Sequence, residues 1–312
     1  MSTELIVVVG PTASGKTALG GALAERVGGE IISADAFAVY RGMDIGTAKP
    51  DRALRSLVRH HLVDIADPHE RYSAGMFVRD ADAAIADIRG RGRVPVVVGG
   101  THFYVRALLH GLFPEPPKDP RLRQQLELEW RADPAAVRAR LGEIDPESAA
   151  RIPSADRQRT LRALEVGLLA GRPMTVVWRE HPRHGPRHAF LMLGLNPQKA
   201  DLHARIALRV ERMFAAGLVR EVQGLLAAGV PSQAHALKAI GYRESCGVLE
   251  GTLTLAQAVE KATAATRQLA KRQMTWLRGE SDVEWLPGDG DELLARAILR
   301  VEARRGTGTG PA

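Results

Sequence analysis

The chain has 312 residues, of which 45% are hydrophobic and 25% charged, a composition typical of a globular enzyme with about two domains. No apolar run reaches the roughly 20 residues that a membrane span needs, and the first expected strand begins too early to leave room for a signal peptide. The net charge of +7 favours anionic partners, and the single cysteine, Cys246, excludes an internal disulfide and a cysteine metal site. We therefore expect a cytoplasmic protein.

The first expected strand, residues 5–9, leads into a glycine-rich loop and then into a helical pattern. This order is typical of a phosphate-binding loop, in which backbone N–H groups and the start of the helix surround phosphate oxygens. Lys16 adds a positive charge, and the hydroxyl of Thr17 is a natural Mg²⁺ ligand. The alternative is a turn that binds nothing, but the context favours a di- or triphosphate site. The loop consists of Gly10, Pro11, Thr12, Ala13, Ser14, Gly15, Lys16 and Thr17.

Two more strands are expected at 30–33 and 94–98, with a helix at about 74–89 between them. Alternating strands and helices predict a parallel sheet, whose ligands lie at the carboxyl ends of the strands. Asp35 and Thr101 follow these two strands, so both should lie beside the phosphate loop. Asp35 is a candidate base and otherwise a helix cap, and Thr101 is a candidate site residue and otherwise a turn hydroxyl.

A proline-rich break at 114–117 separates this part from a helical, arginine-rich segment, 119–188, that ends in a basic loop. A strand at 190–195 then resumes the sheet. We interpret residues 1–118 and 189–304 as an α/β core, 119–188 as a helical insertion, and 305–312 as a disordered tail. The arginines that make the segment 119–188 basic are Arg121, Arg123, Arg138, Arg140, Arg151, Arg157, Arg159 and Arg162.

Two further helices, at about 201–215 and 255–277, each carry cations on one face. Either face could simply be solvated. Together with the basic insertion and the phosphate loop, they favour binding of a polyanion such as RNA. The two sets are Arg205, Arg209 and Arg212, and Arg267, Lys271 and Arg278.

A small-molecule or nucleotide kinase remains an alternative, because Asp35 could act as base on a substrate hydroxyl. We find no strand that ends in an acidic residue placed to hold Mg²⁺ or activate water, as ATPases require. A non-catalytic RNA-binding module that uses a nucleotide as a switch is the second alternative.

Six stretches together resemble the tRNA dimethylallyltransferase (isopentenyltransferase) family, over about residues 5–287. The combination is specific, because the phosphate loop alone occurs in many proteins and "GMDIGTAKP" does not. The stretches are GPTASGKT (10–17), SADAFAVYRGMDIGTAKP (33–50), VVVGGTHFYVRALLHG (96–111), QRTLRALEV (158–166), KAIGYRES (238–245) and TRQLAKRQMTWLRG (266–279).

The resemblance implies a P-loop NTPase-like α/β core whose loop holds dimethylallyl diphosphate rather than ATP. The prenyl group would pass to the exocyclic N6 of an adenosine next to the anticodon, position 37 of tRNA, and diphosphate would leave. Lys16, Arg209 and a Mg²⁺ ion on Thr17 would stabilise the leaving group. Asp35 would accept the N6 proton, and Thr101 would contact the reacting region.

The resemblance also implies contacts with the anticodon stem-loop, with the target base flipped out of its stack. Many members carry Ser and Gln where this chain has Ala36 and Ala38, so side-chain hydrogen bonds from those two positions are absent. The alternative for residues 158–166 is an ordinary amphipathic helix with an apolar core stripe, and both roles can hold on opposite faces. We expect a monomer. The implied tRNA-contacting residues are Asp35, Ala36, Phe37, Ala38, Thr101, Arg123, Gln158, Arg159, Thr160, Leu161, Arg162, Lys238, Gly241, Tyr242, Arg243, Arg267, Lys271, Arg272 and Arg278.

Overall fold

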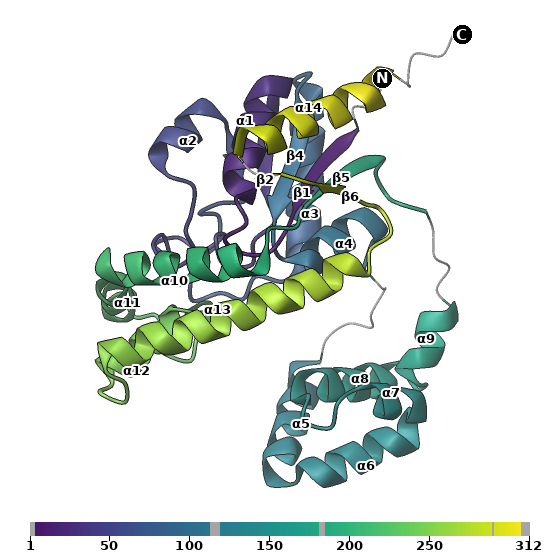
Figure 1. The fold of residues 1–312 in the computed structure, drawn as a ribbon. Helices are drawn as coiled ribbons and strands as arrows, with labels where there is room; N and C mark the ends of the chain where they lie inside the picture. Colours follow the sequence, from purple (N-terminus) through teal and green to yellow (C-terminus); the bar gives the residue numbers. More distant parts are fainter. Residues whose placement is uncertain (1–3, 113–118, 181–184, 289, 307–312) are drawn as a thin grey trace. The chain divides into compact units, whose positions relative to one another are not determined.

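The computed structural model describes residues 4–112, 119–180, 185–288 and 290–306 (Figure 1). The chain divides into two compact units, one of Met1–Leu109 with Pro186–Ala312 and one of His110–Gly185. The proline-rich break at 114–117 lies outside the described residues, as does half of the basic loop. The last helix continues to Gly306, so the first two residues of the expected tail are helical and the others are not described.

The larger unit contains a six-stranded, fully parallel sheet with the strand order β3-β2-β4-β1-β5-β6. The α/β prediction and the four expected strands are confirmed. β3 and β6 were not predicted, because two and four residues are too few to show a strand period. The strands are β1 (Leu5–Val9), β2 (Gly29–Ser33), β3 (His60–His61), β4 (Val94–Gly99), β5 (Phe190–Leu195) and β6 (Val283–Leu286).

Both faces of the sheet are covered, and the central strands are apolar throughout, as parallel strands must be when helices lie on both sides. Ile6 and Val8 of β1 belong to a cluster with α1 (Lys16–Val27) and α14 (Gly290–Gly306). Leu5, Val7 and Val9 belong to the larger cluster on the other face. That cluster also includes residues of α3 (Ala74–Gly90), α4 (His102–His110) and the helices between β5 and β6.

Helices α10 and α13, which lie side by side, carry the two predicted cationic faces (Figure 1). α13 begins at a capping box in which Thr254 and Gln257 satisfy each other's backbone N–H groups, so its start is encoded locally. Both predicted helices are confirmed within two residues at each end. The helices of this segment are α10 (Lys199–Ala215), α11 (Leu218–Ala227), η1 (Ala236–Lys238), α12 (Tyr242–Leu249) and α13 (Leu255–Arg278).

The smaller unit is helical and has its own apolar core, which includes Leu126, Leu141 and Leu161. Three of its helices begin with an aspartate cap followed by proline, the local code for a helix start. Its helices are α5 (Pro120–Ala132), α6 (Pro134–Ile144), α7 (Pro146–Arg151), α8 (Arg157–Ala170) and α9 (Met174–Glu180). The assignment of this unit as an insertion of 119–188 stays a prediction.

A buried carboxylate, Glu30 in β2, ties three segments of the sheet domain together. It accepts hydrogen bonds from Arg91, one of them 2.8 Å long, and lies 2.7 Å from Nε2 of His61 in β3. The hydrogen bonds from Arg91 hold the pKa of Glu30 at about 2, below its ordinary value of 4.5. Because the pKa is depressed in the folded state, this stabilisation is present above pH 4.5 and is lost as the pH falls towards 2.

We expect Glu30→Gln to lower the free energy of unfolding by about 2 kcal/mol at pH 7, because Arg91 loses its buried partner. The difference from wild type should shrink between pH 4.5 and pH 2. Denaturant unfolding at pH 7, 4.5 and 3 measures it. Glu292→Gln, which breaks an exposed i,i+4 pair with Arg296, should cost about 0.5 kcal/mol or less. If the difference in unfolding free energy between Glu30→Gln and wild type stayed constant from pH 7 to pH 3, Glu30 would not have the depressed pKa assigned to it.

Candidate active site

The glycine-rich loop joins β1 to α1 at the carboxyl edge of the sheet. Ala13 and Gly15 adopt left-handed backbone conformations, with φ of 61° and 93°, which fold the loop back towards the helix start. The ammonium of Lys16 donates to the carbonyl of Pro11 at 2.6 Å. The hydroxyl of Ser14 is buried and has no hydrogen-bond partner among the described residues. The loop thus holds a cation and an unsatisfied hydroxyl ready for a ligand.

The next two strand ends contribute Asp35 and Thr101, which the structure brings together as predicted. Thr101 Oγ1 accepts from the N–H of Ala36 at 3.1 Å. Asp35 Oδ1 accepts from the N–H groups of Phe37 and Ala38 at 2.9 and 3.1 Å. Thr101 therefore fixes the turn after β2, as its structural alternative proposed, and Asp35 fixes the same turn rather than capping a helix. Within the described residues, Oδ2 of Asp35 has no hydrogen-bond partner, so one oxygen remains for a substrate.

Arg209 of α10 completes a cluster of opposite charges with Lys16 and Asp35. Burial and, to a lesser extent, the charge of Arg209 lower the pKa of Lys16 to about 7, with Asp35 offsetting part of the effect. Burial also lowers the pKa of Arg209, against the pull of Asp35. Arg205 and Arg212 are exposed, so the cationic face predicted on this helix is divided, and only Arg209 lines the site. Two partly dehydrated cations beside one carboxylate form an anion site.

A pocket of about 370 Å³ opens beside this cluster. Its polar lining residues are Thr12, Asp35, Thr47, Arg209, Lys238, Arg243, Thr266 and Arg272. The remaining wall is largely apolar, and it comes mostly from the helices between β5 and β6. The apolar lining comprises Val210, Met213, Phe214, Leu218, Ala239, Ile240, Ala262 and Leu269.

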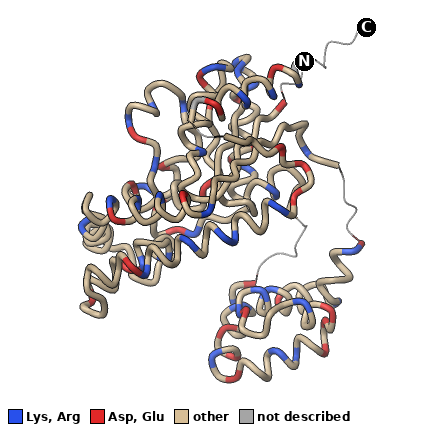
Figure 2. The backbone as a smooth tube through the Cα atoms, in the orientation of Figure 1, with Lys and Arg blue, Asp and Glu red and all other residues tan. Residues whose placement is uncertain are grey.

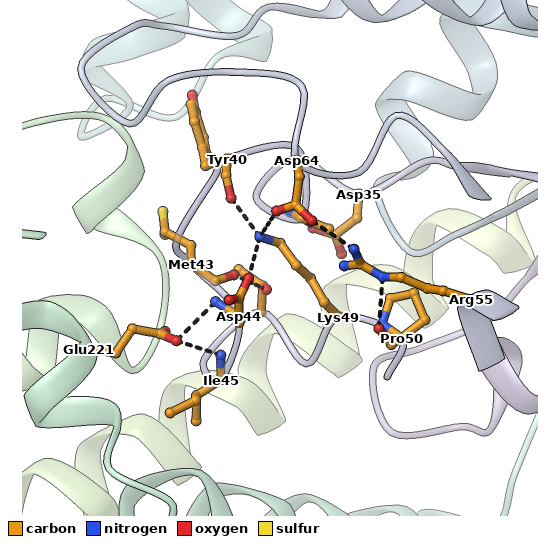
Figure 3. A network of polar contacts seen from close by, with 12 residues as sticks. Asp35, Tyr40, Met43, Asp44, Ile45, Lys49, Pro50, Arg55, Asp64 and Glu221 are labelled. Carbon is orange, nitrogen blue, oxygen red and sulfur yellow. Dashed lines mark hydrogen bonds and ion pairs between the residues drawn. The ribbon is translucent and has the colours of Figure 1, made fainter. Parts of the chain in front are cut away.

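Gly46 and Thr47 of the segment 43–50 line the pocket. Polar contacts around the buried ammonium of Lys49 hold this segment in place (Figure 3). The nearly fully buried ammonium of Lys49 donates to the carbonyl of Tyr40 at 2.6 Å and to Asp44 at 2.7 Å. It also donates to Asp64, which Arg55 binds in turn at 2.8 Å. These contacts explain why the unusual run GMDIGTAKP contains a lysine and an aspartate.

Glu221 of α11, which the sequence analysis missed, holds the same segment from the other side (Figure 3). Its Oε2 accepts from the N–H groups of Asp44 and Ile45 at 3.0 and 2.9 Å, and its Oε1 accepts from the hydroxyl of Tyr242. A Cβ at Gly46 would lie 2.3 Å from the ring of Tyr242, so only glycine fits there. No spacing in the sequence indicates this link, because the partners lie far apart in the chain.

Gln273 of α13 is a second residue that the sequence analysis missed. Its Oε1 accepts from the N–H of Thr12 at 2.7 Å, and its Nε2 donates to the carbonyl of Gly100 at 2.8 Å. A glutamine inside a polar helix gives no signal of burial, although it lies within the quoted stretch 266–279.

Three groups can be distinguished among the predicted tRNA-contacting residues. Lys238, Gly241, Arg243 and Arg272 line the pocket with Asp35 and Phe37. Gln158 and Arg159 are exposed on the smaller unit, where Arg159 lies 3.5 Å from Asp156. The side chains of Ala38, Thr160, Leu161 and Tyr242 are buried, and in this structure they take part in packing.

The positive charge is distributed differently from the sequence-based expectation (Figure 2). Residues 119–180 contain 11 arginines but also 10 carboxylates, and Arg123 and Arg162 both lie against the buried Glu165. Residues 255–279 contain five cations and one carboxylate. Within the described part of the chain, Arg267, Lys271, Arg272 and Arg278 of α13 form no ion pair. The most strongly cationic element is therefore α13.

None of the helices in the described ranges is long and apolar enough to cross a membrane. The described residues also contain no cluster of three His, Cys, Asp or Glu side chains that could hold a metal ion. Thr17, the predicted Mg²⁺ ligand, lies exposed in the first turn of α1. The lone Cys246 is buried, which raises the pKa of its thiol.

Comparison with known proteins agrees with this geometry. Residues 38–280 match the model of the IPP transferase family, and residues 3–68 match that of isopentenyl transferases. The chain is 50% identical to a tRNA dimethylallyltransferase of Halorhodospira halophila, covering 90% of this chain and 92% of the relative. The chain belongs to the IPP transferase family.

Solved structures of IPP transferases share the fold. A tRNA isopentenylpyrophosphate transferase of Bacillus halodurans has a TM-score of 0.73 at 35% identity, covering 99% of this chain and 100% of that one. A eukaryotic dimethylallyltransferase acting on tRNA has a TM-score of 0.76 at 28% identity, covering 91% of this chain and 74% of that one. The predicted P-loop NTPase-like core is confirmed.

We expect the affinity for inorganic pyrophosphate to fall as the pH rises above about 7, the pKa of Lys16 in the unliganded site. Binding of the anion favours the charged ammonium, so binding at pH 8 should take up a proton. Lys16→Met should weaken binding about tenfold or more and abolish the proton uptake. Isothermal titration calorimetry in buffers of different ionisation enthalpy measures both.

The exposed Lys199 at the start of α10 gives the matched control. Lys199→Met should leave both the affinity and the proton uptake as in wild type. Proton uptake that persists in Lys16→Met would assign the titrating group elsewhere.

Proposed function

We propose that the protein transfers the dimethylallyl group of dimethylallyl diphosphate to the exocyclic N6 of an adenosine next to the anticodon of tRNA, releasing diphosphate. The observation that carries the proposal is the pocket, in which Thr12 of the phosphate loop, the cation Arg209, the carboxylate of Asp35 and an apolar wall meet. The names of the similar proteins, tRNA dimethylallyltransferases and isopentenylpyrophosphate transferases, support it.

The donor suits the combination of cationic and apolar residues in the pocket. The diphosphate would lie against the N–H groups of the loop with Lys16 and Arg209, which stabilise the charge that develops on it as it leaves. The unsatisfied hydroxyl of Ser14 also fits a phosphate oxygen. The five-carbon chain would lie against the apolar wall formed by α10 and its neighbours.

The residues present also fit a Mg²⁺ ion. The described residues contain no carboxylate cluster, so Thr17 would hold the ion together with phosphate oxygens and water. When bound, Mg²⁺ would neutralise charge on the diphosphate.

The acceptor amine would lie at Asp35. N6 attacks the allylic carbon, the bond between that carbon and the diphosphate oxygen breaks, and the N6 proton passes to Oδ2 of Asp35. Oδ1 stays in the turn, which fixes the orientation of the carboxylate. Because Thr101 Oγ1 accepts from Ala36, its hydroxyl hydrogen remains to be donated towards the reacting groups.

The base reaches this edge only after leaving the anticodon-loop stack, as enzymes that modify bases require. Lys238, Arg243 and Arg272 line the pocket, and the cations of α13 would contact the phosphates nearby. The kinase alternative is not favoured, since the family and the pocket's apolar wall both fit a prenyl donor. Action in the cytoplasm as a monomer stays a prediction.

Mass spectrometry of tRNA nucleosides tests the function. After incubation with Mg²⁺ and dimethylallyl diphosphate, a prenyl mass should appear on adenosine next to the anticodon, and none should appear with ATP. The same assay with Asp35→Asn, which keeps the Oδ1 contacts of the turn, should show a turnover reduced by about 100-fold or more. The absence of prenyl product, with ATP consumed only when a small acceptor is added, would restore the kinase. Near-normal turnover of Asp35→Asn would remove Asp35 from the chemistry.

We expect the double variant Lys271→Gln/Arg278→Gln to bind tRNA more weakly and with a smaller salt dependence. Each lost phosphate contact should reduce the slope of log K against log salt by about 0.7 to 0.9. Filter binding across a salt series measures it. The control Arg296→Gln/Arg300→Gln removes two cations of α14 that pair with Glu292 and Glu284, and it should leave the slope unchanged. An equal change in both double variants would mean that only the net charge matters.

A further inference from the structure

Gln273 connects the phosphate loop to the end of β4 from a third element, α13. The amide oxygen accepts a hydrogen bond from the N–H of Thr12, which lies 261 residues away in the chain. The amide nitrogen donates one to the carbonyl of Gly100, which lies 173 residues away. Only 9% of Gln273 is exposed. A buried amide is tolerated only where its polar atoms are satisfied, and both ends of this one are.

The surroundings are shaped for that amide. A Cβ at Gly100 would lie 2.5 Å from Nε2 of Gln273, so the strand end leaves room for the amide only because it carries no side chain. An apolar residue of similar size could fill the same space, but it would leave the N–H of Thr12 without its partner. The link is therefore more specific than packing between α13 and the sheet requires.

One of the two bonded backbone groups lies next to the proposed diphosphate site, and the other lies next to the proposed acceptor site. Thr12 precedes Ala13, whose left-handed conformation begins the turn of the cradle. Gly100 precedes Thr101, whose hydroxyl fixes the turn that carries Asp35. One amide thus sets the spacing between the diphosphate site and the acceptor site.

We propose that Gln273 is a positioning residue for the transfer. It holds the N–H-lined cradle in the shape that receives a diphosphate, and it sets the cradle's distance from Thr101 and Asp35. The neighbouring side chain, Arg272, lines the pocket, so α13 both borders the reaction site and holds its loop. This inference rests on the proposed function.

The test compares binding of inorganic pyrophosphate and of tRNA with turnover in Gln273→Met, which keeps the size of the side chain and removes both hydrogen bonds. We expect pyrophosphate to bind about tenfold more weakly, on the scale of buried hydrogen bonds, and the KM for dimethylallyl diphosphate to rise by a similar factor. The dissociation constant for tRNA should stay within about twofold, because the cations of α13 are intact. Gln268→Met, an exposed amide on the same helix, is the control for pyrophosphate binding.

A second variant keeps the test independent of the stability of the first. Gly100→Ala should displace the amide and weaken pyrophosphate binding in the wild-type background. It should have little further effect in Gln273→Met, because interacting positions are not additive. Additive effects would overturn the link, and so would unchanged pyrophosphate binding in Gln273→Met while wild type binds. A wild-type protein that binds no pyrophosphate would overturn the proposed function and the inference with it.

Discussion

The crowding of Lys16 and Arg209 is the constraint on which the rest of the site depends. Two cations partly removed from water repel each other and lose hydration, and Asp35 and the carbonyl of Pro11 compensate them only in part. Such a cluster lowers the stability of the unliganded protein, and rigid elements have to hold its members in place. The fold supplies them, since Lys16 begins α1 and Arg209 lies within the 17-residue helix α10. A bound diphosphate would relieve the repulsion between Lys16 and Arg209, so ligand binding would restore stability that the unliganded protein lacks.

The same edge of the sheet is held together by side chains that bond to backbone groups of distant segments. Thr101 and Asp35 occupy the three N–H groups of residues 36–38, Glu221 occupies those of 44 and 45, and Gln273 occupies that of Thr12. Loops that line a pocket cannot pair their backbone groups with neighbouring strands, so they need such partners. The consequence is a site whose shape is fixed before substrate arrives, which lowers the cost of binding.

The sequence predicted those parts of the structure that are encoded locally. Strand, loop and helix succeed one another around Lys16, and the rule for parallel sheets placed Asp35 and Thr101 beside them. The length of α10 and the face that includes Arg209 followed from helical period. Glu221, Lys49 and Gln273 could not be assigned roles, because each acts through tertiary contacts over long sequence separations. For the same reason, the ion pairs of the arginines in the insertion could not be predicted. Their partners, such as Glu165 and Glu127, come close to them only when the helices have folded.

The turn after β2 limits how this chain can read the RNA. Ala36 and Ala38 offer no polar side chains, and the backbone N–H groups of this turn cannot replace them as donors. The N–H groups of Ala36, Phe37 and Ala38 already donate to Thr101 and Asp35. Phe37 is half-buried and stacks on His235 at 5.9 Å, so what this turn presents to the pocket is an aromatic surface. Stacking on such a surface tolerates any base, because every base has a π-face. Discrimination among anticodon loops therefore has to come from the shape of the pocket and from polar residues on other elements, of which Arg243 and Arg272 lie at its wall.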